Sequence, residues 1–210
     1  MKLYLSSYRI PALNDLLELV GKPANDTKVA LIPNAKDYYA ERARYVKIRD
    51  VTEFFTGLGF HIAVIDLRKF ADADVLQKAL GQYDLIWAMG GNTFNLRYEM
   101  QRSGFEIAIR GLLKAGKVYG GESAGALVAG NNLRGIEYAD DSEFAEKVLW
   151  DGLKLTDHFV LPHVGSADFK DVIQKAREIH KDDKTMVEVT DSQAFVVNGT
   201  DARVIEASEK

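Results

Sequence analysis

The segment most suggestive of chemistry is residues 121–126, Gly-Glu-Ser-Ala-Gly-Ala, which follows a short apolar run and precedes a stretch of small residues. The pattern G-x-S-x-G is typical of a nucleophile elbow, in which a tight strand-to-helix turn holds a serine hydroxyl above the carboxyl edge of a sheet. Ser123 would also lie at the amino end of a helix, where free N–H groups favour a developing negative charge. We therefore predict a nucleophilic role for Ser123. A serine that simply caps a helix in a glycine-rich turn is the alternative.

A serine nucleophile needs a general base, and the chain contains four histidines, His61, His158, His163 and His180. His61 begins an early strand, at the end opposite the edge where sheets of this kind bind ligands. His180 ends a lysine-rich helix, where a solvated histidine favours the helix dipole. His158 and His163 lie on one extended segment and face opposite sides, so only one can point at Ser123. Because His163 stands where this strand opens into a loop, we predict that His163 is the base.

A second glycine feature, residues 89–94 (Met-Gly-Gly-Asn-Thr-Phe), ends another apolar run. No Lys-Ser or Lys-Thr pair follows and no G-x-G-x-x-G pattern opens a helix, so neither a phosphate loop nor a dinucleotide site is predicted. Two glycines let backbone N–H groups approach a ligand, and the N–H groups of Gly91 and Ala124 could form an oxyanion hole. Asn92 or Thr93 could then bind substrate. Alternatively, Asn92 or Thr93 caps the following helix.

A third group should orient the base, and carboxylates cluster between the serine and the histidine. The cluster comprises Glu137, Asp140, Asp141, Glu143 and Glu146. One of them could accept a hydrogen bond from the imidazole and hold its tautomer. The residues by themselves do not separate Asp140 from Asp141.

The segments that must position these residues are short apolar runs alternating with longer amphipathic stretches. Strands are expected at residues 2–6, 28–33, 61–67, 84–89 and 117–120. Helices are expected at residues 12–20, 38–58, 74–80 and 94–115, with Asp37 as a cap and Gly59 as a stop for the second. This order predicts an α/β fold: a doubly wound, mainly parallel sheet with helices on both faces, giving three layers.

Beyond Ser123 the pattern is looser. We expect a short helix at residues 124–130, polar turns at 131–144, an extended segment at 154–162 and a helix at 169–180. Short strands at residues 186–189, 194–197 and 204–205 suggest a closing antiparallel edge, with Asn198-Gly199 as a turn. No internal repeat or linker-like stretch interrupts the chain, so a single domain over residues 1–210 is predicted.

The composition is that of an ordinary globular protein. The chain has 210 residues, 27 basic and 31 acidic side chains, a formal net charge of −4 and 47 % hydrophobic residues. The slightly acidic balance gives no electrostatic footprint for nucleic acid or an anionic membrane. The absence of cysteine excludes disulfides, thiolate metal sites and a cysteine nucleophile. No secretory signal or membrane span is evident, and we expect a soluble cytoplasmic protein without metal or cofactor.

The three motifs in order, GGNTF, GESAGA and LPH, resemble the serine peptidase family of dipeptidase E (α-aspartyl dipeptidase) and cyanophycinase. The resemblance covers most of the chain, from Met1 through the region of His163. It implies a sheet similar to that of class I glutamine amidotransferases, with serine replacing cysteine at the elbow. It also implies Ser123 as nucleophile, His163 as base, and Gly91 with Ala124 as oxyanion hole. An acidic residue between serine and histidine is implied as third member, and the spacing favours Asp141, with Asp140 as the alternative.

The chain departs from this family after the histidine. The aspartyl dipeptidase branch carries a Glu-Thr-Arg-like stretch there, whose arginine is associated with the acidic side chain of the substrate. This chain has Val-Gly-Ser-Ala-Asp-Phe-Lys at residues 164–170, with Lys170, Lys175 and Arg177 as the cations that follow. A lysine ammonium does not reproduce the bidentate grip of a guanidinium. The sequence therefore favours general hydrolysis of peptides over a preference for an N-terminal aspartate.

The leading hypothesis is a serine peptidase that cleaves short peptides through an acyl-enzyme, as a monomer or homodimer. An α/β-hydrolase esterase is the first alternative, and it would require His180 as base. A binding module that keeps the fold without turnover is the second. The sequence leaves open the preferred side chain of the substrate, the choice between exo- and endo-cleavage, and the oligomeric state.

Overall fold

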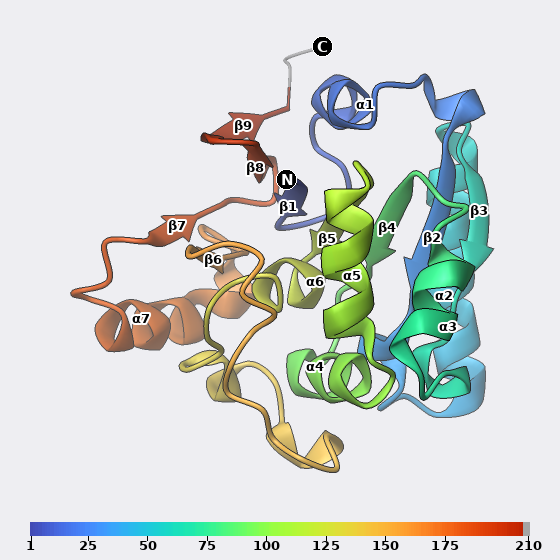
Figure 1. The fold of residues 1–210 in the computed structure, drawn as a ribbon. Coiled ribbons are helices and arrows are strands. Elements are labelled where there is room, and N and C mark those ends of the chain that lie inside the picture. Colours follow the sequence, from blue (N-terminus) through green and yellow to red (C-terminus); the bar gives the residue numbers. More distant parts are fainter. Residues whose placement is uncertain (208–210) are drawn as a thin grey trace.

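A computed structural model describes residues 1–207 and is built around a seven-stranded sheet (Figure 1). The strand order is β3-β2-β4-β5-β1-β8-β9. The first five of these strands are parallel, whereas β8 runs antiparallel to β1 and β9 antiparallel to β8. The strands of this sheet are β1 (Lys2–Ser6), β2 (Lys28–Ile32), β3 (His61–Val64), β4 (Leu85–Ala88), β5 (Val118–Glu122), β8 (Gln193–Asn198) and β9 (Asp201–Glu206).

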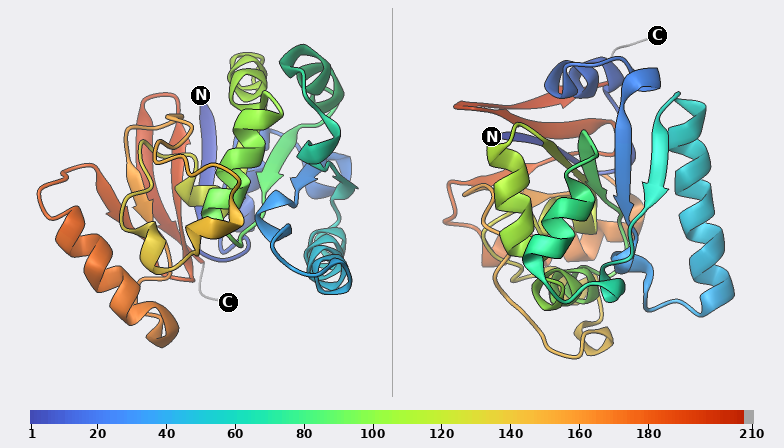
Figure 2. Two further views of the ribbon diagram at one scale, coloured as in Figure 1. Left: turned by 90° about the horizontal axis from the view of Figure 1, so that it is seen from below. Right: turned by 45° about the vertical axis from the view of Figure 1, so that its right-hand side comes forward.

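Helices cover both faces of the sheet (Figure 2). The helices are α1 (Leu13–Val20), α2 (Glu41–Gly57), α3 (Ala73–Leu80), α4 (Thr93–Arg102), α5 (Phe105–Lys114), α6 (Ala124–Leu127) and α7 (Lys170–Ile179). Short 3₁₀ turns lie at η1 (Ala24–Asp26), η2 (Asn34–Lys36), η3 (Leu67–Lys69), η4 (Ile136–Tyr138), η5 (Ser142–Phe144) and η6 (Ala167–Phe169). No helix within residues 1–207 is both long and apolar enough to cross a membrane.

Alternation along the strands assigns side chains to the two faces. Leu3 and Leu5 of β1 belong to the core cluster that includes the apolar residues of α3, α4 and α5. Tyr4, between them, belongs to the cluster under α1 and α2, together with Trp87 of β4. Successive side chains of a strand point to opposite faces, so strands buried on both faces read as continuous apolar runs. The predicted α/β fold with a mainly parallel sheet between two helical layers is confirmed.

Two predicted helices have different limits in the structure. Residues 94–115 form two helices, α4 and α5, because Gly104 adopts a left-handed conformation (φ 77°) between them. Helix α2 begins at Glu41 rather than near Tyr38. Asp37 does not cap it; its carboxylate binds Asn34 Nδ2 at 2.7 Å and Arg44 Nε at 2.5 Å instead.

The predicted antiparallel edge is correct for β8 and β9 and wrong for the strand before them. That strand, β7 (Met186–Glu188), pairs with β6 (Phe159–Leu161) in a separate two-stranded sheet, and the pairing is parallel. The physical reason is the connection: α7 lies between β6 and β7, and a helical crossover joins parallel strands. Of residues 154–162, which the sequence predicts as extended, only Phe159–Leu161 (β6) form a strand. Beneath α7 and the turns of residues 131–144 lies a third apolar cluster, which includes Leu133, Phe159 and Ile173.

The carboxyl ends of β4, β5 and β1 meet at one edge of the sheet because these three strands are parallel neighbours. Gly90-Gly91 follows β4, Ser123 follows β5, and Ser7 follows β1. This edge is where open α/β sheets bind their ligands.

Candidate active site

Ser123 lies in the turn between β5 and α6 with φ 51° and ψ −113°. Such a backbone conformation is strained for a residue other than glycine, by about 1–3 kcal/mol. The turn is held by the Ser123 N–H, which donates to Ser6 O at 3.0 Å. A Cβ atom on Gly121 would collide with the backbone of Gly125, and one on Gly125 would collide with Ala88 O. Close packing at this turn therefore requires both glycines of the motif. The turn has the conformation of the predicted nucleophile elbow.

His163 lies beside Ser123, as the sequence predicts. Its Nε2 is 3.0 Å from Ser123 Oγ. The residue follows β6 and itself has a positive φ of 63°, and its ring stacks on Phe169 with the ring centroids 4.3 Å apart. Backbone conformation and stacking together aim the imidazole at the hydroxyl.

The group on the other side of the imidazole is Asp191, in the turn between β7 and β8. Its Oδ1 is 2.7 Å from His163 Nδ1. An ionised carboxylate only accepts hydrogen bonds, so Nδ1 carries the proton and Nε2 is free to accept from the Ser123 hydroxyl. The buried Ser7 hydroxyl donates to the same Asp191 oxygen at 2.6 Å and accepts from the His163 backbone N–H at 2.7 Å. Ser7 thus fixes both the carboxylate and the backbone of the histidine.

The environment of Asp191 keeps its carboxyl ionised. Burial raises the pKa of Asp191, but the hydrogen bonds from Ser7 and His163 lower it by more, and the net pKa lies below the usual aspartate value. A carboxyl whose pKa is lower in the folded than in the unfolded protein adds stability above the unfolded pKa of about 3.9, and this stability is lost as pH falls through the folded pKa.

We therefore expect Asp191→Asn to lower the free energy of unfolding at pH 6, and the difference from wild type to shrink as the pH falls below about 4. Urea unfolding of both proteins at a series of pH values measures this difference in the free energy of unfolding. The matched control is Asp201→Asn, on the exposed β9 hairpin. A difference for Asp191→Asn that grows toward low pH would contradict the assigned ionisation.

Gly91 and Ala124 follow β4 and β5, which are parallel neighbours, so their backbone N–H groups lie at the same edge of the sheet as Ser123. Within residues 1–207 neither N–H donates to a protein acceptor. Gly91 has φ 143°, and a Cβ atom there would collide with Ala35 O. Two unused donors beside a nucleophile are suited to an oxyanion.

We expect Gly91→Ala to lower kcat by about 10²-fold, because the added methyl displaces one donor from its place. Steady-state kinetics with circular dichroism as a folding check measures this effect. Gly116→Ala is a matched control, since Gly116 also has a positive φ (85°) but open space around its Cβ position. A Gly91→Ala protein with the kcat of wild type would refute this role of the loop.

Comparisons with known proteins identify the family of the chain. Residues 4–205 match the family described as peptidase family S51. The chain belongs to peptidase family S51. It is 29 % identical to an uncharacterized peptidase of Pasteurella multocida over 210 residues, which is 100 % of this chain and 99 % of the relative. It is 33 % identical to an uncharacterized peptidase of Listeria innocua over 67 % of both chains.

Solved structures show the same fold as this S51 peptidase. A crystal structure from Listeria monocytogenes EGD-e, provisionally named Peptidase E, matches with a TM-score of 0.82 at 25 % identity, covering 99 % of this chain and 98 % of that one. A peptidase from an acI-B1 actinobacterium matches with a TM-score of 0.75 at 20 % identity, over 98 % and 87 % of the two chains. The family establishes the chain as a serine peptidase and confirms the resemblance seen in its motifs.

In this S51 peptidase the predicted third member of the site lies elsewhere. The Asp141 carboxylate caps η5 by accepting from Glu143 N–H at 2.9 Å, and Asp191 occupies the position beside the imidazole. Asp140 binds the Thr93 N–H at 2.8 Å. Asp191 follows His163 in the chain, so it lies outside the segment between serine and histidine in which the sequence predicts the acidic residue. Ser7 was missed as well, although its place directly after the first strand was a usable signal.

The sequence makes Asn92 and Thr93 candidates for substrate binding, but both side chains are buried in this S51 peptidase. Asn92 caps α4 by accepting from Asn95 N–H at 2.9 Å, and its amide donates to Asp141 O at 2.8 Å. Asn92 is 3 % exposed and Thr93 is fully buried. Both residues tie the 139–146 loop to the amino end of α4, which corresponds to the capping alternative.

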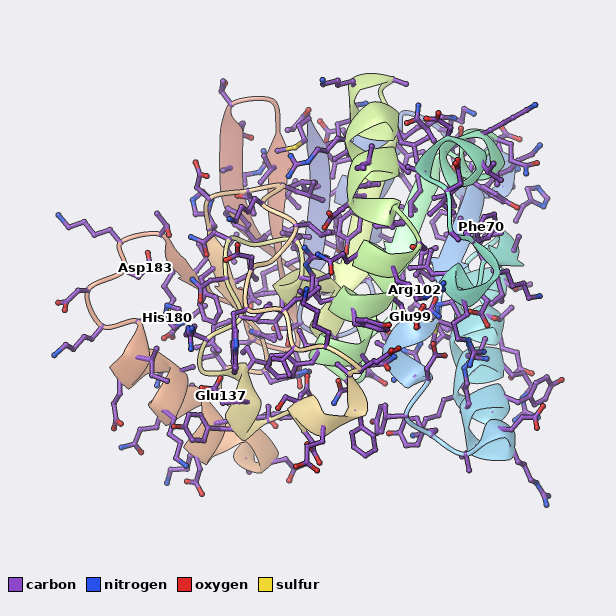
Figure 3. All side chains as sticks on the ribbon, turned by 60° about the horizontal axis from the view of Figure 1, so that its bottom comes forward. Phe70, Glu99, Arg102, Glu137, His180 and Asp183 are labelled. Atoms are coloured by element: carbon purple, nitrogen blue, oxygen red, sulfur yellow. The ribbon has the colours of Figure 1, made fainter. Side chains whose placement is uncertain are left out.

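His180, the base that the esterase alternative requires, has structural partners. His180 is 7 % exposed; its Nε2 lies 2.8 Å from Arg134 O, and its ring stacks on Phe159 with centroids 4.0 Å apart. Figure 3 shows His180 at the end of α7, near Asp183. The esterase alternative therefore lacks its base, since His163, not His180, contacts Ser123. Within residues 1–207 no group of three or more His, Cys, Asp or Glu side chains is arranged to hold a metal ion.

Proposed function

We propose that this chain hydrolyses short peptides through an acyl-enzyme, with Ser123 as nucleophile, His163 as general base and Asp191 as the residue that orients the base. One observation carries the proposal: the hydroxyl, the imidazole and the carboxylate form a continuous chain of contacts, 3.0 Å at Nε2 and 2.7 Å at Nδ1. This is the arrangement that activates a serine for acyl transfer.

In the proposed reaction Ser123 Oγ attacks the scissile carbonyl carbon while His163 Nε2 takes the hydroxyl proton. The carbonyl oxygen becomes an oxyanion that accepts from the N–H groups of Gly91 and Ala124. The imidazolium then gives its proton to the leaving amine, and the peptide C–N bond breaks. A water molecule then attacks the ester carbonyl carbon while His163 takes a proton from it. The bond between this carbon and Ser123 Oγ breaks, and the imidazolium returns the proton to Oγ, which releases the acid product. The positive charge on the imidazolium is balanced by Asp191.

The test is labelling with a fluorophosphonate followed by peptide mapping. We expect one adduct, on Ser123, and expect His163→Ala to lose labelling while His180→Ala retains it. His180→Ala is the matched control because it removes a histidine outside the chain of contacts. A folded protein that remains unlabelled, or that loses labelling only with His180→Ala, would refute the proposal.

Some sequence-based expectations stay predictions. They are the single domain over residues 1–210, a cytoplasmic location, the absence of nucleic acid partners, and a monomeric or homodimeric state. None of them affects the proposed chemistry.

A further inference from the structure

Two cavities of opposite character meet at Ser123 and His163, and these two residues are all that their linings share. The first has a volume of about 240 Å³ and contains three cationic side chains, Arg9, Lys36 and Lys47. The second has about 30 Å³ and is mainly apolar; its lining includes Leu127, Ile136, Leu161, Phe169, Val172 and Ile173. A substrate bound at Ser123 adjoins both.

In the part of the chain that the structure describes, the cations of the first cavity form no direct ion pair. Within residues 1–207 no side-chain nitrogen of Arg9, Lys36 or Lys47 lies within 4.0 Å of a carboxylate oxygen. The Nη1 atom of Arg9 is buried without any hydrogen-bond partner. Leaving such a donor unpaired costs free energy that a bound acceptor would recover. The guanidinium is held in place over the rings of Tyr8 and Phe54, at 5.4 and 5.1 Å from the ring centroids.

The carboxylates of the same cavity are already engaged. Glu122 is 5 % exposed and accepts from the backbone N–H of Arg9 at 2.8 Å. Asp50 lies 3.3 Å from the guanidinium of Arg49 on the surface of α2. Burial lowers the pKa of Lys36 by more than the charge of Glu122 raises it, so Glu122 only partly offsets the cost of burying this ammonium. The lining holds three cations and two carboxylates, Glu122 and Asp50, and a carboxylate ligand would balance the remaining positive charge.

The second cavity disfavours a carboxylate. Its carboxylate, Asp140, is half-buried and accepts from the Thr93 N–H, and desolvation raises the pKa of Asp140 by more than its hydrogen bonds lower it. A second carboxylate brought here would lose its hydration and face Asp140. Arg177, on the helix that borders this cavity, does not offset the repulsion between the two carboxylates. Both its Nε and its Nη2 donate to Glu188, at 2.6 and 2.7 Å. Small uncharged apolar side chains fit the space and the lining.

We propose that the substrates are short peptides whose free C-terminal carboxylate binds in the cavity of Arg9 and Lys36 and whose acyl-side residue places a small apolar side chain in the second cavity. The inference rests on the proposed function at Ser123. In a dipeptide only the peptide nitrogen and one α-carbon separate the carboxylate from the scissile carbonyl, so a cavity adjoining Ser123 is within reach. An acidic side chain on the acyl residue would instead have to enter beside Asp140.

Four peptides test the inference: Ala-Ala, Ala-Ala-NH₂, Asp-Ala and Asp-Ala-NH₂. We expect kcat/KM for Ala-Ala to exceed that for Ala-Ala-NH₂ by about 10-fold or more, the size expected of a charge-assisted contact. We expect Asp-Ala to be slower than Ala-Ala. Lys36→Met should bring the acid-to-amide ratio toward one, and Arg9→Met should do the same. Lys69→Met, which removes an exposed lysine outside both cavities, should leave the ratio unchanged.

The outcomes separate this inference from the proposed function. If Ser123 is labelled and Ala-Ala and Ala-Ala-NH₂ are cleaved at equal rates, the inference is overturned while the proposed function stands. Faster cleavage of Asp-Ala-NH₂ than of Ala-Ala-NH₂ also overturns the inference alone, because the cationic cavity would then bind a side-chain carboxylate. If labelling occurs without peptide cleavage, the readout is protection of Ser123 from the fluorophosphonate. Protection by Ala-Ala and not by its amide supports the inference; equal protection overturns it. Absence of both labelling and cleavage refutes the proposed function, and the inference with it.

Discussion

Ser123→Ala is expected to lower kcat for peptide hydrolysis by about 10⁶-fold, the loss typical of removing the nucleophile of a serine–histidine pair. In the structure the hydroxyl contacts His163 Nε2 at 3.0 Å, while the turn is held by backbone bonds that alanine keeps. The midpoint temperature of thermal unfolding should therefore change by no more than a few degrees. Active-site titration of the wild-type protein gives the number of functional sites per chain.

Ser166→Ala is the control for this prediction, because Ser166 lies in the loop after His163 but outside both cavities. A Ser123→Ala protein with substantial remaining turnover would rule out the acyl-enzyme. A wild-type protein that binds peptides and never cleaves them would instead favour a binding module on this fold.

The second large effect concerns the carboxylate that orients the base. We expect Asp191→Asn to lower kcat by about 10⁴-fold, because the amide leaves the imidazole in the wrong tautomer without disturbing its position. Asp141→Asn should cost less than about 10-fold, since asparagine also caps a helical turn. The pair of variants distinguishes the two acidic residues directly when kcat is measured at one pH near neutrality.

Circular dichroism and the unfolding midpoint show whether each of these two variants is folded. If Asp141→Asn proved the more damaging of the two in kcat with both proteins folded, the hydrogen bond between Asp191 and His163 would not be the catalytic one.

The sequence by itself determined the parts of the site that depend on local structure. The conformation of Ser123 is set by a strand, a short helix and two glycines packed against each other, all within residues 118–127. Gly91 follows the next strand in space at the same edge, and a sheet of parallel strands brings such ends together whatever the loops do. His163 could be selected because it stands where a strand opens into a loop. The strand–helix order alone predicts that these residues lie at one edge of the sheet.

Only the tertiary structure decided the partner of the histidine. Strand β8 runs antiparallel to β1, with Ser6 opposite Ala194, so the start of β8 lies at the edge where the parallel strands β1, β5 and β4 have their carboxyl ends. This reversal brings Asp191 to the site, although it precedes a strand instead of following one. The cationic cavity is likewise assembled from separate segments, the loop after β1, η2 and α2. Contacts between charged residues that are far apart in the sequence depend on which strands become neighbours in the sheet. The local pattern of residues does not specify the order of the strands.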